Sequence, residues 1–236
     1  MKSLIQHING TLNRSHSECI NEWKLNDQSS KFCMFYPKNI KELINIIKDR
    51  LIQNSKKPYL LDIDTSLITD MSGLFSNFES KFFMGLYEYG EYSEIEELDL
   101  HSWNMSNVTN IECMFHNCYN LKTINIAGWN IIKVQNMNGL FDTCVSLENF
   151  YTTKLDTRNV KNMPFVFHDC RKIKYLDLST WNTSKVDNFR YMFDGCENLT
   201  EIKGIGDWKL SKRVGSWGME HMFSNCPVTR PSWYIG

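Results

Sequence analysis

The chain has 236 residues, of which 42% are hydrophobic and 13% aromatic, which is enough apolar material for a substantial core and too much for a disordered chain. Its formal net charge of −1 predicts no general attraction to nucleic acid or to anionic membranes. No apolar run approaches the roughly 18 residues that a membrane span needs. We therefore expect neither nucleic acid nor membrane as a partner.

Residues 1–34 are predicted to form an N-terminal extension. Leu4, Ile8 and Leu12 share one helical face, although Gly10 weakens a helix there. The segment either packs on the body of the protein or docks on a partner or a larger assembly. Polar residues interrupt the apolar stretch after the basic start, so we predict no secretory signal and expect a cytoplasmic protein.

Residues 39–53 have the pattern of an amphipathic helix that begins after Pro37. The apolar positions fall on one stripe: Ile40, Leu43, Ile44, Ile47 and Leu51. A helix with one polar side can cover the core of a terminal repeat. We interpret residues 35–58 as a helical cap.

Residues 59–236 contain an internal repeat with a period of 26 residues. Each of four copies ends in a cysteine, and a phenylalanine stands three residues before it. The cysteines are Cys118, Cys144, Cys170 and Cys196. Two degenerate copies flank these four, at 60–78 and 199–226. Because a unit this short cannot bury its apolar face alone, the period predicts a solenoid.

Within one copy, Leu98-Asp99-Leu100 alternates as a strand does, and a polar turn comes next. After the turn, Val108, Ile111, Met114 and Phe115 have the spacing of one or two helical turns. We therefore predict an α/β solenoid: a right-handed, leucine-rich-repeat-like stack of about six strand–short-helix units, with an N-terminal helical cap.

The run LDLHSWNMSNVTNIECMFHNCYNL at 98–121, with its counterpart at 176–199, resembles the BspA-like leucine-rich repeat, also known as a Mycoplasma-type lipoprotein repeat of unknown function. The upstream stretches FYPKNIKELINIIKDRLIQ and LLDIDTSLITDMSGLF resemble the segment that leads into such repeats. The resemblance covers about residues 35–226. It implies cell-surface adhesion or protein binding, with no catalytic residues and no cofactor. The copy at 147–170 departs from the pattern, with Leu155 in the tryptophan position and Pro164.

An insertion at 79–92 separates the first two copies. It is rich in aromatic residues, among them Phe83, Tyr87 and Tyr89, a composition found at the centres of binding surfaces. We predict that it contacts a partner; the alternative is that it folds back on its own flank.

The cysteine column is predicted to point into the core as a ladder of reduced thiols, which fits a reducing compartment. A zinc site at Cys113, His116 and Cys118 is the alternative, but there is no CxxC pair and Asp142 replaces the histidine in the next copy. We predict no metal and no cofactor. No nucleophile–base motif is present, so we predict no enzyme.

A basic loop at 206–218 carries Lys209, Lys212 and Arg213 with two tryptophans. Three charges are too few for nucleic-acid contact, and we interpret the loop as solvated.

The residues that flank the buried position of each strand should face outward and form the binding surface. With the aromatic insertion, these candidates are Glu97, Asp99, His101, Asn125, Tyr151, Tyr175 and Asp177. We predict a non-enzymatic protein-interaction module whose partner carries a basic or amphipathic patch. It would act as an inhibitor or adaptor, including a viral or mobile-element blocker of a host factor. The alternatives are a BspA-like surface adhesin, a structural part of an assembly, or polar residues that only keep the sheet soluble. The sequence leaves the oligomeric state open.

Overall fold

The computed structural model describes residues 34–76, 94–152 and 154–235. The chain divides into two units, Met1–Met34 and Phe35–Gly236, and of the first only Met34 is described. The insertion residues Phe83, Tyr87 and Tyr89 therefore lie outside the described residues, as does the predicted N-terminal extension. The described helices and strands all belong to the second unit.

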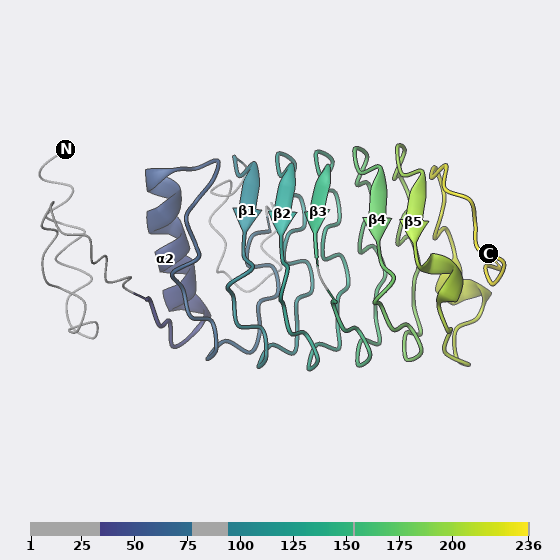
Figure 1. The fold of residues 1–236 in the computed structure, drawn as a ribbon, viewed down its shortest axis with the longest axis horizontal. Helices are drawn as coiled ribbons and strands as arrows, with labels where there is room; N and C mark the ends of the chain where they lie inside the picture. Colours follow the sequence, from purple (N-terminus) through teal and green to yellow (C-terminus); the bar gives the residue numbers. More distant parts are fainter. Residues whose placement is uncertain (1–33, 77–93, 153, 236) are drawn as a thin grey trace, which may run out of the picture. The chain divides into compact units, whose positions relative to one another are not determined.

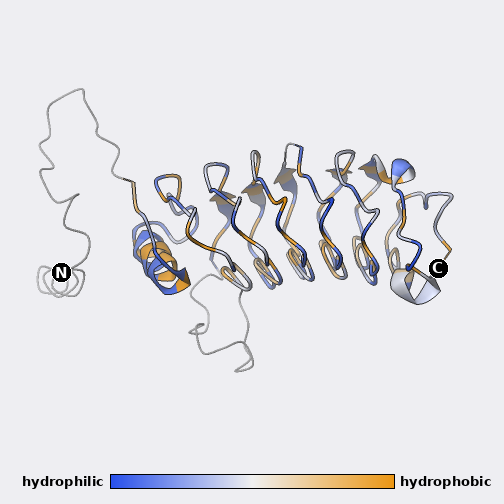
Figure 2. Cartoon of the chain, turned by 90° about the horizontal axis from the view of Figure 1, so that it is seen from below, coloured by the Kyte–Doolittle hydropathy of each residue, from blue (hydrophilic) through white to orange (hydrophobic). Residues whose placement is uncertain are grey.

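Helix α2, Ile40–Gln53, lies where the sequence predicts a helix. Asn39 caps its first turn, since the Asn39 side chain accepts a hydrogen bond from the Glu42 N–H at 3.1 Å. Figure 2 shows orange and blue residues on different sides of the helix, and the apolar side belongs to the same core as the repeats. Among the described residues, no helix has the length and apolarity that a membrane crossing requires.

Five strands of three residues each come after the helix along the chain (Figure 1). They are β1 (Glu97–Asp99), β2 (Thr123–Asn125), β3 (Asn149–Tyr151), β4 (Tyr175–Asp177) and β5 (Glu201–Lys203). Neighbouring strands pair in parallel with a register of 26 residues, so that Leu98 lies opposite Ile124 and Ile124 opposite Phe150. One sheet has the order β1-β2-β3 and the other β4-β5. The middle residue of each strand faces the core, and its two neighbours face outward.

Two short 3-10 helices lie in the last copy: η1 (Ile205–Asp207) and η2 (Ser216–Met219). They fall in the copy that the sequence shows to be four residues longer than the others.

The segment that returns from the strands is held to the next copy by its backbone. The N–H groups of Ile111, Cys113 and Phe115 bond to carbonyls of the next copy at 3.3, 2.8 and 3.0 Å. Isolated parallel bridges join Asn110 to Asn136 and continue to later copies in the same column. Each copy therefore satisfies many of its backbone groups with its neighbours, in addition to the hydrogen bonds of its own turns.

Asparagine and aspartate side chains shape the turns of each copy. The Asn104 side chain accepts a hydrogen bond from the Ser106 N–H at 3.1 Å, and the Asn110 side chain accepts one from Glu112 at 3.1 Å. Asn125 does the same with Ala127, also at 3.1 Å. These Asx turns recur at equivalent positions in other copies, which explains why the repeat keeps Asn or Asp at three positions.

Two columns of side chains fill the core. Phenylalanine rings from successive copies stack with centroids 5.2 to 5.9 Å apart, in the order Phe75, Phe115, Phe141, Phe167, Phe193 and Phe223. Beside them, the cysteine Sγ atoms donate to a phenylalanine carbonyl of the preceding copy; Cys144, for example, lies 3.1 Å from the oxygen of Phe115. The prediction that the cysteine column points into the core is confirmed, and the described cysteines are free thiols.

The predicted fold class, an α/β solenoid of strand–short-helix units, is wrong. Among the described residues α2 is the one α-helix, and it precedes the repeats. Turns at 112–117 take the place of the short helix predicted over 108–115: Cys113 has a φ of 53° and Asn117 a φ of 60°, which right-handed helical backbone does not allow. The 3-3-1 spacing of apolar residues arises from these turns. The strands also form two small sheets instead of one continuous sheet.

One copy differs from the others in composition at the break between the two sheets. Thr152 occupies the inward position that Leu100 and Ile126 fill in earlier copies. The Thr152 hydroxyl is buried without a hydrogen-bond partner among the described residues, and so is the indole N–H of Trp181. By contrast, the indole N–H of Trp129 donates to the Leu100 carbonyl at 2.8 Å. Smaller and more polar core residues thus coincide with the missing strand pairing.

Replacing Thr152 by valine should raise the free energy of unfolding by about 1 kcal/mol, because the change keeps the side-chain shape and removes an unpaired buried hydroxyl. Urea unfolding followed by circular dichroism measures this.

The matched control is Thr157→Val. The Thr157 hydroxyl is also buried, but it donates to the Asn182 carbonyl at 3.0 Å and accepts from the Asn182 N–H at 2.8 Å. This change should lower the free energy of unfolding by about 1–3 kcal/mol. Effects of the same sign at both positions would contradict our account of the break.

Candidate interaction surface

The strands bring most of the predicted surface residues onto one face. Asp99, Asn125 and Tyr151 are direct partners in the register of β1, β2 and β3. Tyr175 and Asp177 extend the face onto β4, across the break between the sheets. The described part of the predicted site is thus assembled from four copies that are far apart in sequence.

The negative charge of this face is compensated within the chain. Glu96 binds both Lys56 and Lys122 at 2.6 Å, and hydrogen bonds from Lys122 and Lys56 lower the pKa of Glu96 to about 2. Glu97 forms an ion pair with Lys57. The negative charge that led us to predict a basic partner is therefore balanced by lysines of the same chain.

Asp177 and Asp99 are engaged in the same way. Lys203 lies 2.8 Å from Asp177, and its hydrogen bond lowers the pKa of Asp177 to about 2. Asp99 contacts His101 Nδ1 at 2.7 Å and accepts a hydrogen bond from the Asn125 amide at 3.0 Å. The Lys203–Asp177 and Asn125–Asp99 contacts tie neighbouring strands together.

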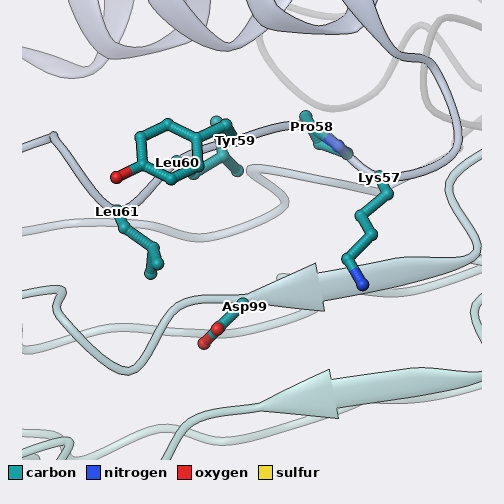
Figure 3. Close-up of a pocket in the computed structure, with 6 residues that line it drawn as sticks. All are labelled: Lys57, Pro58, Tyr59, Leu60, Leu61 and Asp99. Atoms are coloured by element: carbon teal, nitrogen blue, oxygen red, sulfur yellow. The ribbon is translucent and has the colours of Figure 1, made fainter.

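A small cavity of about 180 Å³ adjoins Asp99, lined mainly by residues 57–61 (Figure 3). Figure 3 shows the Lys57 side chain extending toward β1, with Asp99 at the end of that strand. Its walls are mostly apolar, but small-molecule sites usually occupy about 300–1,000 Å³. The cavity is a minor feature of the strand face.

Two tyrosines dominate the uncharged part of the face. Tyr151 is 54% exposed and Tyr175 is 46% exposed, and they lie on the two strands that border the break. Exposed tyrosines supply large contact area at low conformational cost, and they are enriched among the residues that dominate binding energy.

A second hollow, which the sequence analysis missed, lies in the last copy and has a volume of about 630 Å³. Trp217, His221, Arg230 and Tyr234 line it, and Arg190 from the preceding copy stacks 4.8 Å from the Trp217 ring. The sequence marks Trp217 only as part of a solvated loop, because its partner Arg190 comes from another copy.

Within this hollow, the Ser224 hydroxyl lies 3.2 Å from His221 Nδ1. Glu220 lies 3.7 Å from His221 Nε2 but binds Arg190 at 2.5 Å. The carboxylate is therefore positioned for the guanidinium rather than for orienting the imidazole as a base.

Histidine and aspartate alternate in one half-buried column beside the cysteines. Asp142 lies 3.0 Å from His116 Nδ1 and 2.7 Å from His168 Nδ1. Burial alone would raise the pKa of Asp142, but hydrogen bonds from the two histidines outweigh burial and lower this pKa to about 2. The hydrogen bond to Asp142 raises the pKa of His168. Over the described ranges, no three or more His, Cys, Asp or Glu side chains are grouped to hold a metal ion.

Nearby Cys113 is a poor nucleophile. Burial raises the pKa of its thiol to about 12, so that the thiolate is scarcely populated near neutral pH.

The fold and this surface together define a repeat protein with parallel stacked copies. The sequence profile of the family described as "Mycoplasma protein of unknown function, DUF285" matches residues 50–149 and 119–232. The two matches overlap and together span most of the chain, so the protein belongs to this family. A search among curated proteins found no match.

The His168–Asp142 contact should make stability depend on pH. A raised folded-state pKa for His168 adds stability that is complete below the unfolded value of about 6.5 and disappears as pH rises through the folded value. The lowered pKa of Asp142 adds stability that is present above about 4 and is lost as pH falls toward about 2. The contribution of the pair is therefore largest near pH 5.

We expect His168→Gln to lower the free energy of unfolding by about 1 kcal/mol near pH 5.5 and by much less near pH 9. Urea denaturation across this pH range measures the difference. His101→Gln is the control. His101 also contacts an aspartate, Asp99, at 2.7 Å, but the two side chains are 48% and 44% exposed, so that solvent screens the interaction. A pH-independent effect at position 168 would contradict the assignment.

Proposed function

We propose that this protein is a non-enzymatic interaction module whose protein partner docks on the strand face over Tyr151 and Tyr175. The observation that carries the proposal is that these two half-exposed rings flank the one interruption of strand pairing between the described strands β1 to β5. Exposed aromatic rings at the centre of a surface supply much of the binding energy of protein interfaces.

The charge arrangement supports this choice of position. Glu96, Glu97 and Asp177 already have lysine partners. A protein that covers the face therefore does not bury these three carboxylates without a compensating charge. Near the break, Glu148 pairs with Lys172 and Asn149 is neutral, which leaves Lys174 as an exposed charge beside the two tyrosines. The exposed tyrosine rings bind through apolar area and a hydroxyl. We therefore favour a partner with an amphipathic patch over one that is simply basic.

A binding role rather than catalysis is supported by the engagement of Glu220 with Arg190, which leaves the His221–Ser224 pair without an orienting carboxylate. We propose no cofactor and no metal. The free, buried thiols support a cytoplasmic, reducing location. In that setting the module would serve as an inhibitor or adaptor, including a viral or mobile-element blocker of a host factor.

The resemblance to BspA-like repeats motivates a second candidate, a surface adhesin. A structural part of a larger assembly, held by residues 1–34, is a third. Fractionating the cells that make the protein separates the first two, since an adhesin resides at the surface. Deleting residues 1–30 and measuring incorporation into an assembly tests the third.

Replacing Tyr151 and Tyr175 together by alanine should abolish capture of the partner or weaken it at least about tenfold, because hot-spot aromatics each contribute about 2 kcal/mol or more. The measurement is a pull-down from the native lysate, followed by titration of the captured protein.

Tyr119→Ala is the matched control. Tyr119 is 42% exposed but lies in a turn outside the strands, so its removal should leave capture unchanged. If the double variant captured the same protein as the wild type with equal affinity, the strand face would not be the site.

A further inference from the structure

A line of basic residues runs along one corner of the stacked copies. We call it the corner ridge and define it as residues 130–135, 156–161, 182–187 and 209–213, the equivalent segments of four successive copies. It holds seven basic and two acidic residues, a net charge of +5 in a chain whose net charge is −1. The basic residues are Lys133, Arg158, Lys161, Lys185, Lys209, Lys212 and Arg213.

Contacts between copies place these segments side by side. The Lys161 N–H bonds to the Gln135 carbonyl at 2.9 Å, and the Asp187 N–H bonds to the Lys161 carbonyl at 3.0 Å. The buried Thr183 hydroxyl donates to the Lys209 carbonyl at 3.1 Å, which holds the last segment in line. With neighbouring chains about 4.8 Å apart, Lys133 and Lys185 are separated by roughly 10 Å.

The three lysines of the central copies bond to amide oxygens rather than to carboxylates. Lys133 Nζ donates to the Asn107 side chain at 2.7 Å, and Lys185 Nζ donates to the Asn159 side chain at 2.7 Å. Lys161 Nζ donates to Gln135 at 3.1 Å. These neutral acceptors orient the ammonium groups along the stack and leave their charge uncompensated.

The strand side of the same copies is arranged differently. Five lysines on the strand side each lie within 4 Å of a carboxylate: Lys56, Lys57, Lys122, Lys172 and Lys203. Lys174, on the same side, has no such carboxylate among the described residues. On the corner ridge, the ion pairs among the described residues are Arg158 with Asp156 and Arg213 with Asp187. Unmatched positive charge therefore collects at the corner, although the chain as a whole is near neutral.

We propose that the corner ridge binds an acidic, extended segment of a protein partner. Complementary charge is what steers and orients such an encounter. The ridge contains no aromatic residue, so it offers nothing for bases to stack on, as single-stranded nucleic acid requires. Asp156 and Asp187 also interrupt it, which opposes the continuous negative charge of a phosphate backbone. A peptide can place neutral residues at those two points.

A membrane is a poorer fit for the same surface. Peripheral binding to anionic lipid is strengthened by exposed apolar side chains that enter the interface. Of the aliphatic residues of the ridge, Ile131, Val134, Val160 and Val186 are buried, and Ile132 and Leu210 are partly exposed, so the fully exposed side chains of the ridge are polar.

The ridge and the strand face are separate surfaces, and neither proposal depends on the other. The ridge proposal can fail while Tyr151 and Tyr175 still bind a partner, and the reverse also holds.

The test is a titration of the full chain with a fluorescein-labelled peptide of ten glutamates at low salt, read by fluorescence anisotropy. We expect Lys133→Gln, Lys161→Gln and Lys185→Gln combined to weaken binding about tenfold. The control combines Lys122→Gln, Lys172→Gln and Lys203→Gln, which removes the same charge from the strand side. It should change the affinity less than about twofold. Tyr151→Ala with Tyr175→Ala should also leave peptide binding unchanged.

Charge-conserving replacement of the three ridge lysines by arginine should restore binding, which separates loss of charge from loss of fold. Three outcomes would overturn the proposal: no binding by the wild-type chain, equal loss in the ridge and control variants, or no rescue by arginine. A single-stranded decanucleotide, or phosphatidylserine vesicles, bound more tightly than the peptide and lost with the same ridge variant would assign the ridge to that class instead.

Discussion

The structure depends on hydrogen bonding between copies. The N–H groups that an α-helix would bond within itself are directed to the neighbouring copy, as with Cys113 N–H and the Asn138 carbonyl, 25 residues along the chain. A single copy satisfies part of its backbone through its own turns, as with Trp103 N–H and the Leu100 carbonyl, and depends on its neighbours for the rest. This requirement fixes the period. The last copy is four residues longer, but its extra residues lie between the strand pairing of β5 and the return segment, and both ladders continue into it.

The same requirement explains why chemically similar residues recur in columns. A phenylalanine is best packed against the phenylalanine of the next copy, with ring centroids about 5 Å apart, and a cysteine thiol donates to a carbonyl that the preceding copy presents. Where one copy departs from the pattern, the effect is local. Thr152 and Leu155 replace larger apolar side chains, the strand pairing fails beside them, and the phenylalanine column passes the break without interruption.

Stacking also separates charges that the sequence intermixes. Acidic and basic residues on the strand side fall opposite each other and neutralise one another, as Glu96 does with Lys122. On the corner, each lysine lies next to an asparagine or glutamine of the preceding copy. Because these side chains are neutral, the positive charge of the lysines is not compensated. A chain with a formal net charge of −1 thus presents a neutral aromatic face and a separate basic ridge. The two proposed interactions rest on these two surfaces.

The sequence by itself determined the period, the core columns, the helix at 39–53 and the outward positions of the strands, because these depend on local pattern and on regular spacing. It did not determine the backbone of the returning segment, where a helical spacing of apolar residues hides left-handed turns at Cys113 and Asn117. Only the tertiary structure decided that point, since the partners of those N–H groups belong to another copy. The charge balance of each surface was decided in the same way: Lys57 and Glu97 meet across 40 residues, and Lys133 and Lys185 share a ridge across 52. Contacts of this kind cannot be predicted from a local sequence pattern, because they depend on how the copies are aligned with one another.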